Sequence, residues 1–268
     1  MKINFIGGGN MARAIIGGLK QNGLDMTAIT VLEPNAQKRT ELTHEFNVQV
    51  TDAYAGFKNS DVIVLAVKPQ QLKEVCASLA PVLGSQLVVS IAAGVRSKDI
   101  SRWLGNYPAI VRVMPNTPAQ IQAGISALYA MPQVSEIQCE QANLILAAVG
   151  KTLWLKDEAQ MDAVTAISGS GPAYVFYFIE ALQDAGIALG LDAEASKLLA
   201  LQTFAGASQL AVHSHEDIKT LRAQVTSKGG TTEQGILSLE TADIKAIVSK
   251  AAKAAADKSV QLGDQLGV

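Results

Sequence analysis

Cysteine, histidine and long apolar runs are scarce in this sequence, and each scarcity excludes a class of protein. The two cysteines, Cys76 and Cys139, provide neither a disulfide framework nor a cysteine cluster for a metal. Uninterrupted apolar runs, such as residues 62–67, are far too short to cross a bilayer. The chain begins with a strand-like apolar run rather than a basic segment and a cleavage site, so we expect a cytoplasmic protein with no membrane partner.

An excess of charge of one sign is also absent. The 22 basic and 24 acidic residues nearly balance, to a net charge of −2, and no basic run occurs, so nucleic acid is not an expected partner. Charged residues make up only 17% of the chain, against 49% apolar residues. This composition favours a subunit interface that buries apolar side chains, although a large core alone would also explain it.

The first part of the chain alternates between apolar runs of strand length and segments of helical length. Such alternation predicts right-handed crossovers and a mostly parallel sheet covered by helices. The predicted strands span residues 2–6, 28–32, 48–50, 61–67, 87–91, 110–113, 124–129 and 152–155. The predicted helices span residues 10–22, 36–46, 70–80, 98–104 and 136–149.

Beyond about residue 156 the strand pattern stops and alanine-rich helical spacing replaces it. Helices are predicted over residues 172–189, 193–213, 216–225, 232–239 and 242–261. The change predicts two domains. Residues 1–157 form an α/β domain with a mostly parallel sheet, and residues 158–268 form an all-helical domain.

A glycine turn near the start of the chain indicates what the first domain binds. Gly7, Gly9 and Ala12 have G-x-G-x-x-A spacing and stand between a predicted strand and a predicted helix. In such a turn the first glycine permits the tight bend, the second lets the backbone approach a pyrophosphate, and the small third residue lets helix and strand pack closely. Unpaired N–H groups at the positive end of the helix dipole then hold the pyrophosphate. We therefore predict a Rossmann-like domain that binds a dinucleotide.

Side chains after the second predicted strand favour opposite coenzymes. Glu33 lies close to the roughly 20-residue offset at which an acidic side chain accepts the ribose hydroxyls of NAD. Lys38 and Arg39, one helical turn further on, are placed to pair with the 2′-phosphate of NADP, although a solvated helix face explains Lys38 more simply. Both NADH and NADPH therefore stay open as the coenzyme.

Three more loops follow the ends of predicted strands, where ligands bind in open α/β sheets. Lys68 follows the 61–67 strand and is either a ligand contact or a solvated charge. The small residues of the SIAAG segment offer a flat surface for a nicotinamide ring. Asn116 lies between two prolines, which hold its amide rigidly, as a preorganised site requires.

The helical half contains two glycine-rich segments, SGSGPAY at residues 168–174 and TSKGGTTE at residues 226–233, each predicted to open a helix. Glycines, hydroxyls and free N–H groups at a helix start form an anion-binding site. A substrate carboxylate would suit the second segment, beside the hydroxyls of Ser227 and Thr232, although a plain helix cap explains it too. Thr231 and Gln234 have capping-box spacing for that helix.

Six segments resemble pyrroline-5-carboxylate reductases, and together they extend over nearly the whole chain. They are GGGNMARAIIGGL, AVKP, SIAAG, MPNTPA, SGSGPAYVFYFIEAL and TSKGGTTEQGILSLE. The resemblance implies NAD(P)H-dependent reduction of the C=N bond of 1-pyrroline-5-carboxylate, a cyclic imino acid, to L-proline, which is the last step of proline biosynthesis. It also implies a Rossmann domain followed by a helical dimerisation domain. The implied assembly is a homodimer, which in this family often assembles further into a decamer of five dimers, with active sites formed between the cofactor domain of one subunit and helices contributed with its partner.

The resemblance assigns roles to residues at matching positions. The cofactor role falls on Gly7, Gly9, Asn10, Met11, Ala66, Lys68, Pro69, Ala92, Ala93, Gly94 and Asn116, and the substrate-carboxylate role on Ser227, Gly230, Thr231 and Thr232. Two positions depart from the family pattern. Lys228 stands where members usually carry proline. Glu33, which we also assign to the cofactor, stands where many relatives carry a residue suited to a 2′-phosphate, so the usual NADPH preference does not carry over.

Catalysis is expected to depend mainly on positioning, because a cyclic imine can take its proton from water. None of the three histidines lies in the segments above, and no metal is expected. We assign proton supply to the Thr232 hydroxyl first, with the Ser170 hydroxyl and an ordered water as alternatives.

Two other functions stay open on the sequence alone. β-Hydroxyacid dehydrogenases and imine reductases share the two-domain plan, but the hydroxyacid enzymes commonly use a lysine early in the helical domain, and residues 159–191 contain none. A non-catalytic NAD(P)-sensing protein of this fold would carry a plain helix cap at residues 226–233.

Overall fold

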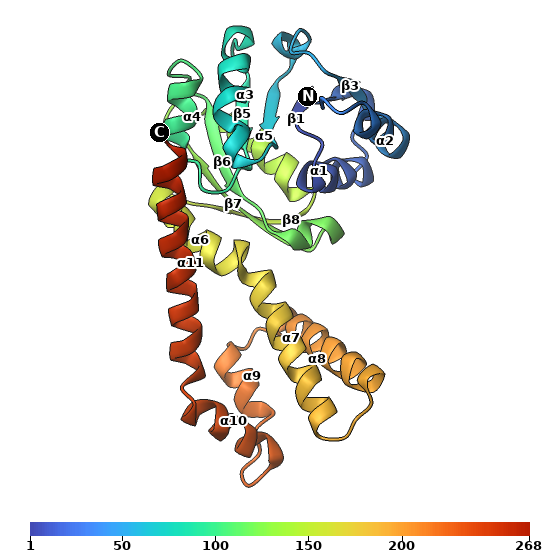
Figure 1. The fold of residues 1–268 in the computed structure, drawn as a ribbon, viewed down its shortest axis with the longest axis vertical. Helices are drawn as coiled ribbons and strands as arrows, with labels where there is room; N and C mark the ends of the chain where they lie inside the picture. The colour runs from blue at the N-terminus through green and yellow to red at the C-terminus, as the bar shows by residue number, and fades with distance from the viewer. The chain divides into compact units, whose positions relative to one another are not determined.

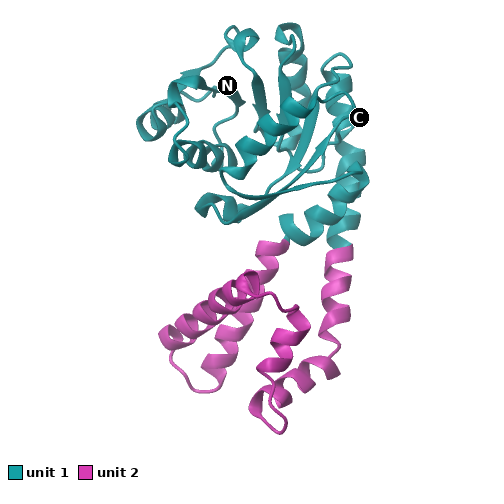
Figure 2. Cartoon of the chain, turned by 180° about the vertical axis from the view of Figure 1, so that it is seen from behind, with its two compact units in different colours: residues 1–170, 254–268 teal, residues 171–253 magenta.

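The computed structural model describes residues 1–268, which divide into two compact units. Unit 1 comprises residues 1–170 together with residues 254–268, and unit 2 comprises residues 171–253 (Figure 2). The last stretch of the chain therefore returns to the first unit. The division at residues 157/158 expected from composition stays a proposal.

Unit 1 is built on one eight-stranded sheet with the strand order β3-β2-β1-β4-β5-β6-β7-β8 (Figure 1). All neighbouring strands are parallel except β6 and β7, which confirms the mostly parallel sheet. The strands are β1 (Ile3–Ile6), β2 (Ile29–Leu32), β3 (Gln49–Thr51), β4 (Val62–Leu65), β5 (Leu87–Ser90), β6 (Ile110–Met114), β7 (Gly124–Ala130) and β8 (Gly150–Trp154).

Helices cover both faces of this sheet, because most strands are apolar on both sides. On one face α1, α2 and α5 pack over β1 side chains such as Phe5, and on the other face α3 and α4 pack over side chains such as Ile6. Alternate residues of a strand point to opposite faces, so adjacent apolar residues supply two separate cores. The helices are α1 (Asn10–Gln21), α2 (Ala36–Phe46), α3 (Leu72–Leu79), α4 (Ser97–Trp103), α5 (Glu136–Ala147) and the short α6 (Met161–Val164).

The strand order places a topological switch point at β1. The chain leaves β1 toward β2 on one side and later returns to β4 on the other. The carboxyl ends of β1, β2, β4, β5 and β6 meet at one edge of the sheet, where open α/β sheets bind their ligands. All of the loops predicted to bind the cofactor follow these five strands.

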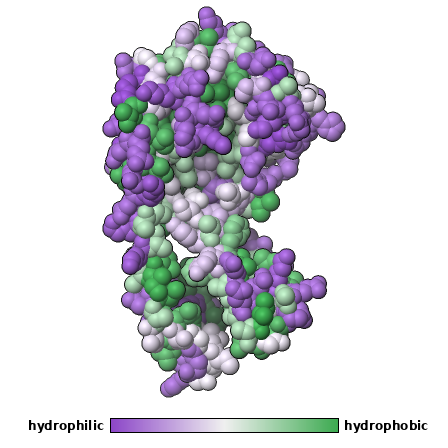
Figure 3. Space-filling view, viewed as in Figure 1, coloured by the Kyte–Doolittle hydropathy of each residue, from purple (hydrophilic) through white to green (hydrophobic).

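Unit 2 is entirely helical, as predicted. It contains α7 (Gly171–Ala188), α8 (Ala193–His213), α9 (Ile218–Gln224), α10 (Thr231–Thr241) and the first part of α11 (Ile244–Leu266). Large apolar side chains stand exposed on these helices, among them Phe176, Tyr177 and Val212, which are 65%, 69% and 78% exposed. Figure 3 shows hydrophobic residues on the outer surface of the helices. A surface of this kind marks a protein–protein interface.

No helix in the structure combines the length and the apolar composition that a membrane crossing requires.

Candidate active site

The glycine turn between β1 and α1 has the geometry that its spacing predicts. Gly7 has φ +99°, and an added Cβ would lie only 2.7 Å from the carbonyl oxygen of Ala66, so only glycine fits there. Gly9 is the N-cap of α1, and nothing lies within 4 Å of the position that its Cβ would take. The start of α1 is therefore an uncovered cradle of N–H groups at the positive end of a helix, which fits a dinucleotide pyrophosphate.

Glu33 braces this turn from the neighbouring strand. Its side chain is 93% buried by the surrounding chain, with 7% left exposed, and one carboxylate oxygen accepts the Gly8 N–H at 3.1 Å. The other oxygen accepts the Asn35 N–H, also at 3.1 Å. The carboxylate predicted to meet the ribose thus already fixes the backbone of the glycine turn. The sequence did not single out Gly8, because nothing in its spacing distinguishes it from its neighbours.

Arg39, the residue that favoured NADP, is also held within the chain. Its guanidinium donates to the carbonyl oxygens of Glu33 and Pro34 at 2.8 and 2.9 Å. It also forms an ion pair with Asp52 across 3.5 Å, and Asp52 is largely exposed. Arg39 itself is only 22% exposed, but because Asp52 lies largely in water the pair contributes little free energy, and an incoming anion can take the place of Asp52.

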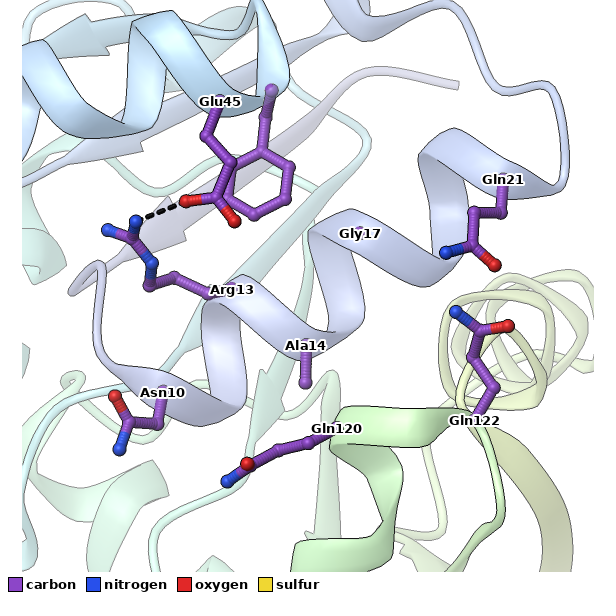
Figure 4. Close-up of a pocket in the computed structure, with 9 residues that line it drawn as sticks. Asn10, Arg13, Ala14, Gly17, Gln21, Glu45, Gln120 and Gln122 are labelled. Carbon is purple, nitrogen blue, oxygen red and sulfur yellow. Dashed lines mark hydrogen bonds and ion pairs between the residues drawn. The ribbon is translucent and has the colours of Figure 1, made fainter.

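Asn10, predicted to contact the cofactor, is exposed at the first position of α1 and lines an open groove of about 420 Å³ beside this helix. Figure 4 shows Arg13 directed toward Glu45 on one side of α1, with Gln120 and Gln122 on the other side of the helix. Since Glu45 neutralises the only cation lining the groove, the groove itself does not favour a phosphate group.

The loops after β4 and β5 differ in how much of them is accessible. Ala66 lies against Gly7, while Lys68 is exposed at the start of the turn that Pro69 opens and forms no ion pair. In the next loop Ala93 is exposed, whereas Ala92 and Gly94 are buried. The ammonium of Lys68 and the surface of Ala93 are therefore free to meet a ligand.

Asn116, after β6, is held by both atoms of its amide. Its oxygen accepts the Ile125 N–H at 3.0 Å, and its nitrogen donates to the Ser168 hydroxyl at 3.3 Å. Ser168 lies in a π-helical turn, Thr165–Gly169, and turns of this kind are frequent at functional sites. The prediction that residues 168–174 open a helix is confirmed, because α7 begins at Gly171. The π turn precedes that start, and the Ser170 N–H is already donated to the Thr165 carbonyl at 2.7 Å.

Unit 2 carries the second predicted site, the 226–233 loop before α10. The helix begins at Thr231 with Gly230 as N-cap, so the predicted capping box of Thr231 and Gln234 is wrong. Instead Glu233 accepts the Gly229 N–H at 2.7 Å, and the Gly230 N–H is donated to the Ser227 carbonyl at 3.0 Å. A capping box was expected because the helix start was placed one residue late. The first-turn amides of α10 lack intrahelical partners, as in any helix start.

Two buried features lie outside the sequence predictions. Arg112 on β6 is buried and forms an ion pair with Glu158 at 3.0 Å, and Glu158 also accepts the N–H and hydroxyl of Ser97. This network joins three segments far apart in sequence, so no local pattern could reveal it. Burial also raises the pKa of the Cys76 thiol to about 12, so that thiol is not a nucleophile.

No group of three or more histidine, cysteine or acidic side chains is arranged to hold a metal ion. All three histidines are exposed, on α2 or near the end of α8. What the structure offers is a dinucleotide cradle and a glycine-rich loop, with hydroxyls and backbone amides as the polar groups.

Comparison with known proteins identifies the family. Residues 158–262 match the family model for pyrroline-5-carboxylate reductase dimerisation, and residues 2–94 match the model for coenzyme F420-dependent NADP oxidoreductases. The chain is 48% identical to pyrroline-5-carboxylate reductase of Pseudomonas aeruginosa, over 99% of this chain and 98% of the relative.

Solved structures give the same result. A pyrroline-5-carboxylate reductase of Coxiella burnetii superposes with a TM-score of 0.94 at 43% identity, over 97% of this chain and 98% of that one. The pyrroline carboxylate reductase of Plasmodium falciparum with NADP bound superposes with a TM-score of 0.86 at 32% identity, over 98% of both chains. With identity of this level along its whole length, the chain belongs to the pyrroline-5-carboxylate reductase family.

Proposed function

We propose that this chain carries out the reaction of its family, the NAD(P)H-dependent reduction of 1-pyrroline-5-carboxylate to L-proline, in the manner set out below. The observation that carries the proposal is the similarity to curated reductases, with 40–48% sequence identity over nearly the whole chain. The open dinucleotide cradle at Gly7 and Gly9 agrees with it. When bound, NAD(P)H supplies the hydride that reduces the C=N bond.

The cofactor is held by residues of unit 1 that end or follow β1, β2, β4, β5 and β6. The start of α1 takes the pyrophosphate, because its amides are open and its dipole is positive at that end. The exposed Ala93 gives the nicotinamide ring a flat surface, and the braced amide of Asn116 orients it. The full set is Gly7, Gly9, Asn10, Met11, Glu33, Ala66, Lys68, Pro69, Ala92, Ala93, Gly94 and Asn116.

Both coenzymes are used, and Glu33 disfavours the 2′-phosphate of NADPH. The buried carboxylate cannot move away without releasing the Gly8 and Asn35 amides. Arg39 offsets part of this repulsion, because its weak pair with Asp52 can be exchanged for a phosphate.

The 226–233 loop holds the carboxylate of the imino acid. The amides of Thr231 and Thr232 and the hydroxyl of Ser227 are the donors, and Gly230 keeps the loop tight, since an added Cβ would lie 2.6 Å from the Ser227 hydroxyl oxygen. Lys228, in place of the usual proline, adds a positive charge beside the loop, while Glu233 adds a negative one.

Thr232 supplies or relays the proton to the imine nitrogen. Its hydroxyl lies at the first turn of α10, next to the donors assigned to the carboxylate, and it is exposed. The chain offers no histidine in its candidate site segments, so a hydroxyl or a water has to fill this role.

The protein is a homo-oligomer, in keeping with its match to the dimerisation model and the apolar surface of unit 2. Dimers assemble further into a decamer of five, and the protein works in the cytoplasm, where its two free cysteines stay reduced.

The direct test follows the absorbance of NADH and NADPH with and without the cyclic imine. Oxidation of either coenzyme that depends on the imine and yields L-proline supports the proposal. Oxidation that instead needs a carbonyl acid, or coenzyme binding with no turnover, would favour a hydroxyacid dehydrogenase or a non-catalytic sensor.

A further inference from the structure

The last turns of α11 pack closely against the loop formed by Ala92, Ala93 and Gly94. A Cβ added to Gly263 would lie 3.0 Å from the carbonyl oxygen of Gly94, and one added to Gly94 would lie 3.5 Å from Cβ of Leu262. Gly94 has φ +79°, so its conformation excludes a side chain for a second reason. The Gly94 carbonyl therefore lies against the helix at Gly263, with the side chains of Leu262 and Leu266 beside it.

Basic side chains form an ion pair and hydrogen bonds with the same end of α11. Arg96, two residues after Gly94, forms an ion pair with Asp264 at 2.7 Å. Arg102 of α4 donates to the carbonyl of Gly267, and Lys73 of α3 donates to the carbonyl of Val268 at 2.7 Å. Cations at the carboxyl end of a helix are favoured by its dipole, so α3, α4 and the β5 loop all attract this end of α11.

The same loop is anchored by β5 and by the core, in which Ala92 and Val95 are buried. Ile91 is still held by the sheet, since its N–H is donated to the Leu65 carbonyl at 3.2 Å. Beyond it the Ala92 N–H reaches the Ser90 hydroxyl only at 3.4 Å, which is a weak hydrogen bond. The position of Ala93 and Gly94 is thus set on one side by β5 and on the other by α11.

We propose that Gly263, with the end of α11 around it, is a positioning element of the cofactor site. By fixing Gly94, it holds the 92–94 loop in the conformation that receives the nicotinamide ring, so the affinity for NAD(P)H depends on helix residues that do not touch the cofactor. The proposal rests on the proposed function only in taking this loop as part of the cofactor site.

The ion pair and the glycine contact contribute differently. The Asp264 side chain is 63% exposed, and an exposed pair adds little to stability. The glycine contact is with a backbone atom, so an added methyl group presses on the Gly94 carbonyl at 3.0 Å as well as on the Arg96 side chain at 3.2 Å. The Arg96 side chain can rotate away, whereas the Gly94 carbonyl can yield only by a small shift of the loop, and this shift is the effect that Gly263→Ala tests.

The test measures the Kd of NADH and NADPH by calorimetry without substrate, for wild type, Gly263→Ala and the control Gln265→Ala. Gln265 is exposed in the same helical turn, so its variant should match wild type. Gly263→Ala is expected to raise Kd for both coenzymes about tenfold, with unchanged assembly and unchanged KM for the imino acid. A merely structural role would lower Tm and leave Kd of the folded protein unaltered.

A second pair of variants covers the case in which Gly263→Ala fails to fold. Asp264→Arg places like charges together at an exposed position, so it should fold and raise Kd severalfold, and adding Arg96→Asp should restore the wild-type Kd. Unaltered Kd in every folded variant would overturn the proposal. A wild type that binds coenzyme but does not reduce the imine would instead contradict the proposed reaction, and the Kd comparison would still decide the role of Gly263.

Discussion

At the scale of single residues, the two glycines of the turn, Gly7 and Gly9, are constrained in different ways. Gly7 is required by the fold, because of its positive φ and its contact with Ala66. Gly9 has an ordinary φ of −74° and open space around it, so nothing within the chain excludes a side chain there, and the space is free for a ligand. The two positions look alike in the sequence, and the structure assigns them different constraints.

Alanine at each glycine should therefore have a different effect. Gly7→Ala strains the backbone and collides with Ala66, which should lower the free energy of unfolding by about 1–3 kcal/mol. Gly9→Ala should leave Tm within a degree or two of wild type and raise Kd for NADH and NADPH about tenfold or more. Thermal unfolding and calorimetry check both. Equal loss of stability in the two variants would mean that Gly9 too is structural.

Glu33 combines two roles that substitution can separate. Glu33→Gln keeps an oxygen for the Gly8 N–H and removes the charge, whereas Glu33→Ser removes both. If the charge repels the 2′-phosphate, both variants should shift the ratio of kcat/KM for NADPH over NADH upward by about tenfold. Only Glu33→Ser should also lower the affinity for NADH, because the glycine turn loses the hydrogen bond from the Gly8 N–H to the residue 33 side chain. Steady-state kinetics with both coenzymes measures this. A hundredfold NADPH preference in wild type that Glu33→Ser leaves unaltered would contradict the assignment.

At the scale of elements, the role of the 226–233 loop depends on which residues hold the start of α10. Its glycines and hydroxyls fit a carboxylate, but its predicted capping box is wrong, since Glu233 rather than Gln234 accepts the backbone amide. A shift of one residue at a helix start is enough to exchange those partners.

Substitutions at Thr232 test whether the loop supplies the proton to the imine nitrogen. Thr232→Ala should lower kcat by up to about a hundredfold if the hydroxyl supplies or relays the proton, and Thr232→Ser should restore most of it. Cofactor affinity, measured separately, serves as the control and should stay unchanged. Near-normal kcat in Thr232→Ala with an unchanged KM for the imine would assign the proton to water or to Ser170.

Much of the element structure follows from sequence because it is local. Alternating apolar runs correctly predicted the order of strands and helices, and the boundaries of α2 and α8 agree with the predicted ones. The docking of α11 on Gly94 and the Arg112–Glu158 pair could not be predicted, because they join residues far apart in the chain. The π turn at Thr165–Gly169 also has no local signature, so Ser168 was not linked to Asn116.

At the scale of the whole molecule, the low content of charged residues agrees with the apolar surface of unit 2. Its helices leave large apolar side chains in water, as the composition suggested, and residues 158–262 match a dimerisation model. The match and the exposed apolar side chains agree with a homo-oligomer.

Phe176→Asp should weaken that assembly, because a charge would replace an apolar side chain that is 65% exposed on α7. Light scattering should show smaller species at micromolar concentration, and activity should fall with dissociation. Ile137→Asp, on α5 and outside the dimerisation match, is the matched control for an equally exposed residue. Dissociation by the control alone would place the interface elsewhere.

The chemistry itself is tested most directly by following the transferred hydrogen. The protein should be incubated with 1-pyrroline-5-carboxylate and either NADH or NADPH in which both hydrogens at nicotinamide C4 are replaced by deuterium, and the product analysed by mass spectrometry and NMR. We predict L-proline that carries deuterium at the former imine carbon, formed in equal amount to the oxidised coenzyme. Proline without deuterium, or coenzyme oxidation without proline, would contradict hydride transfer to the cyclic imine.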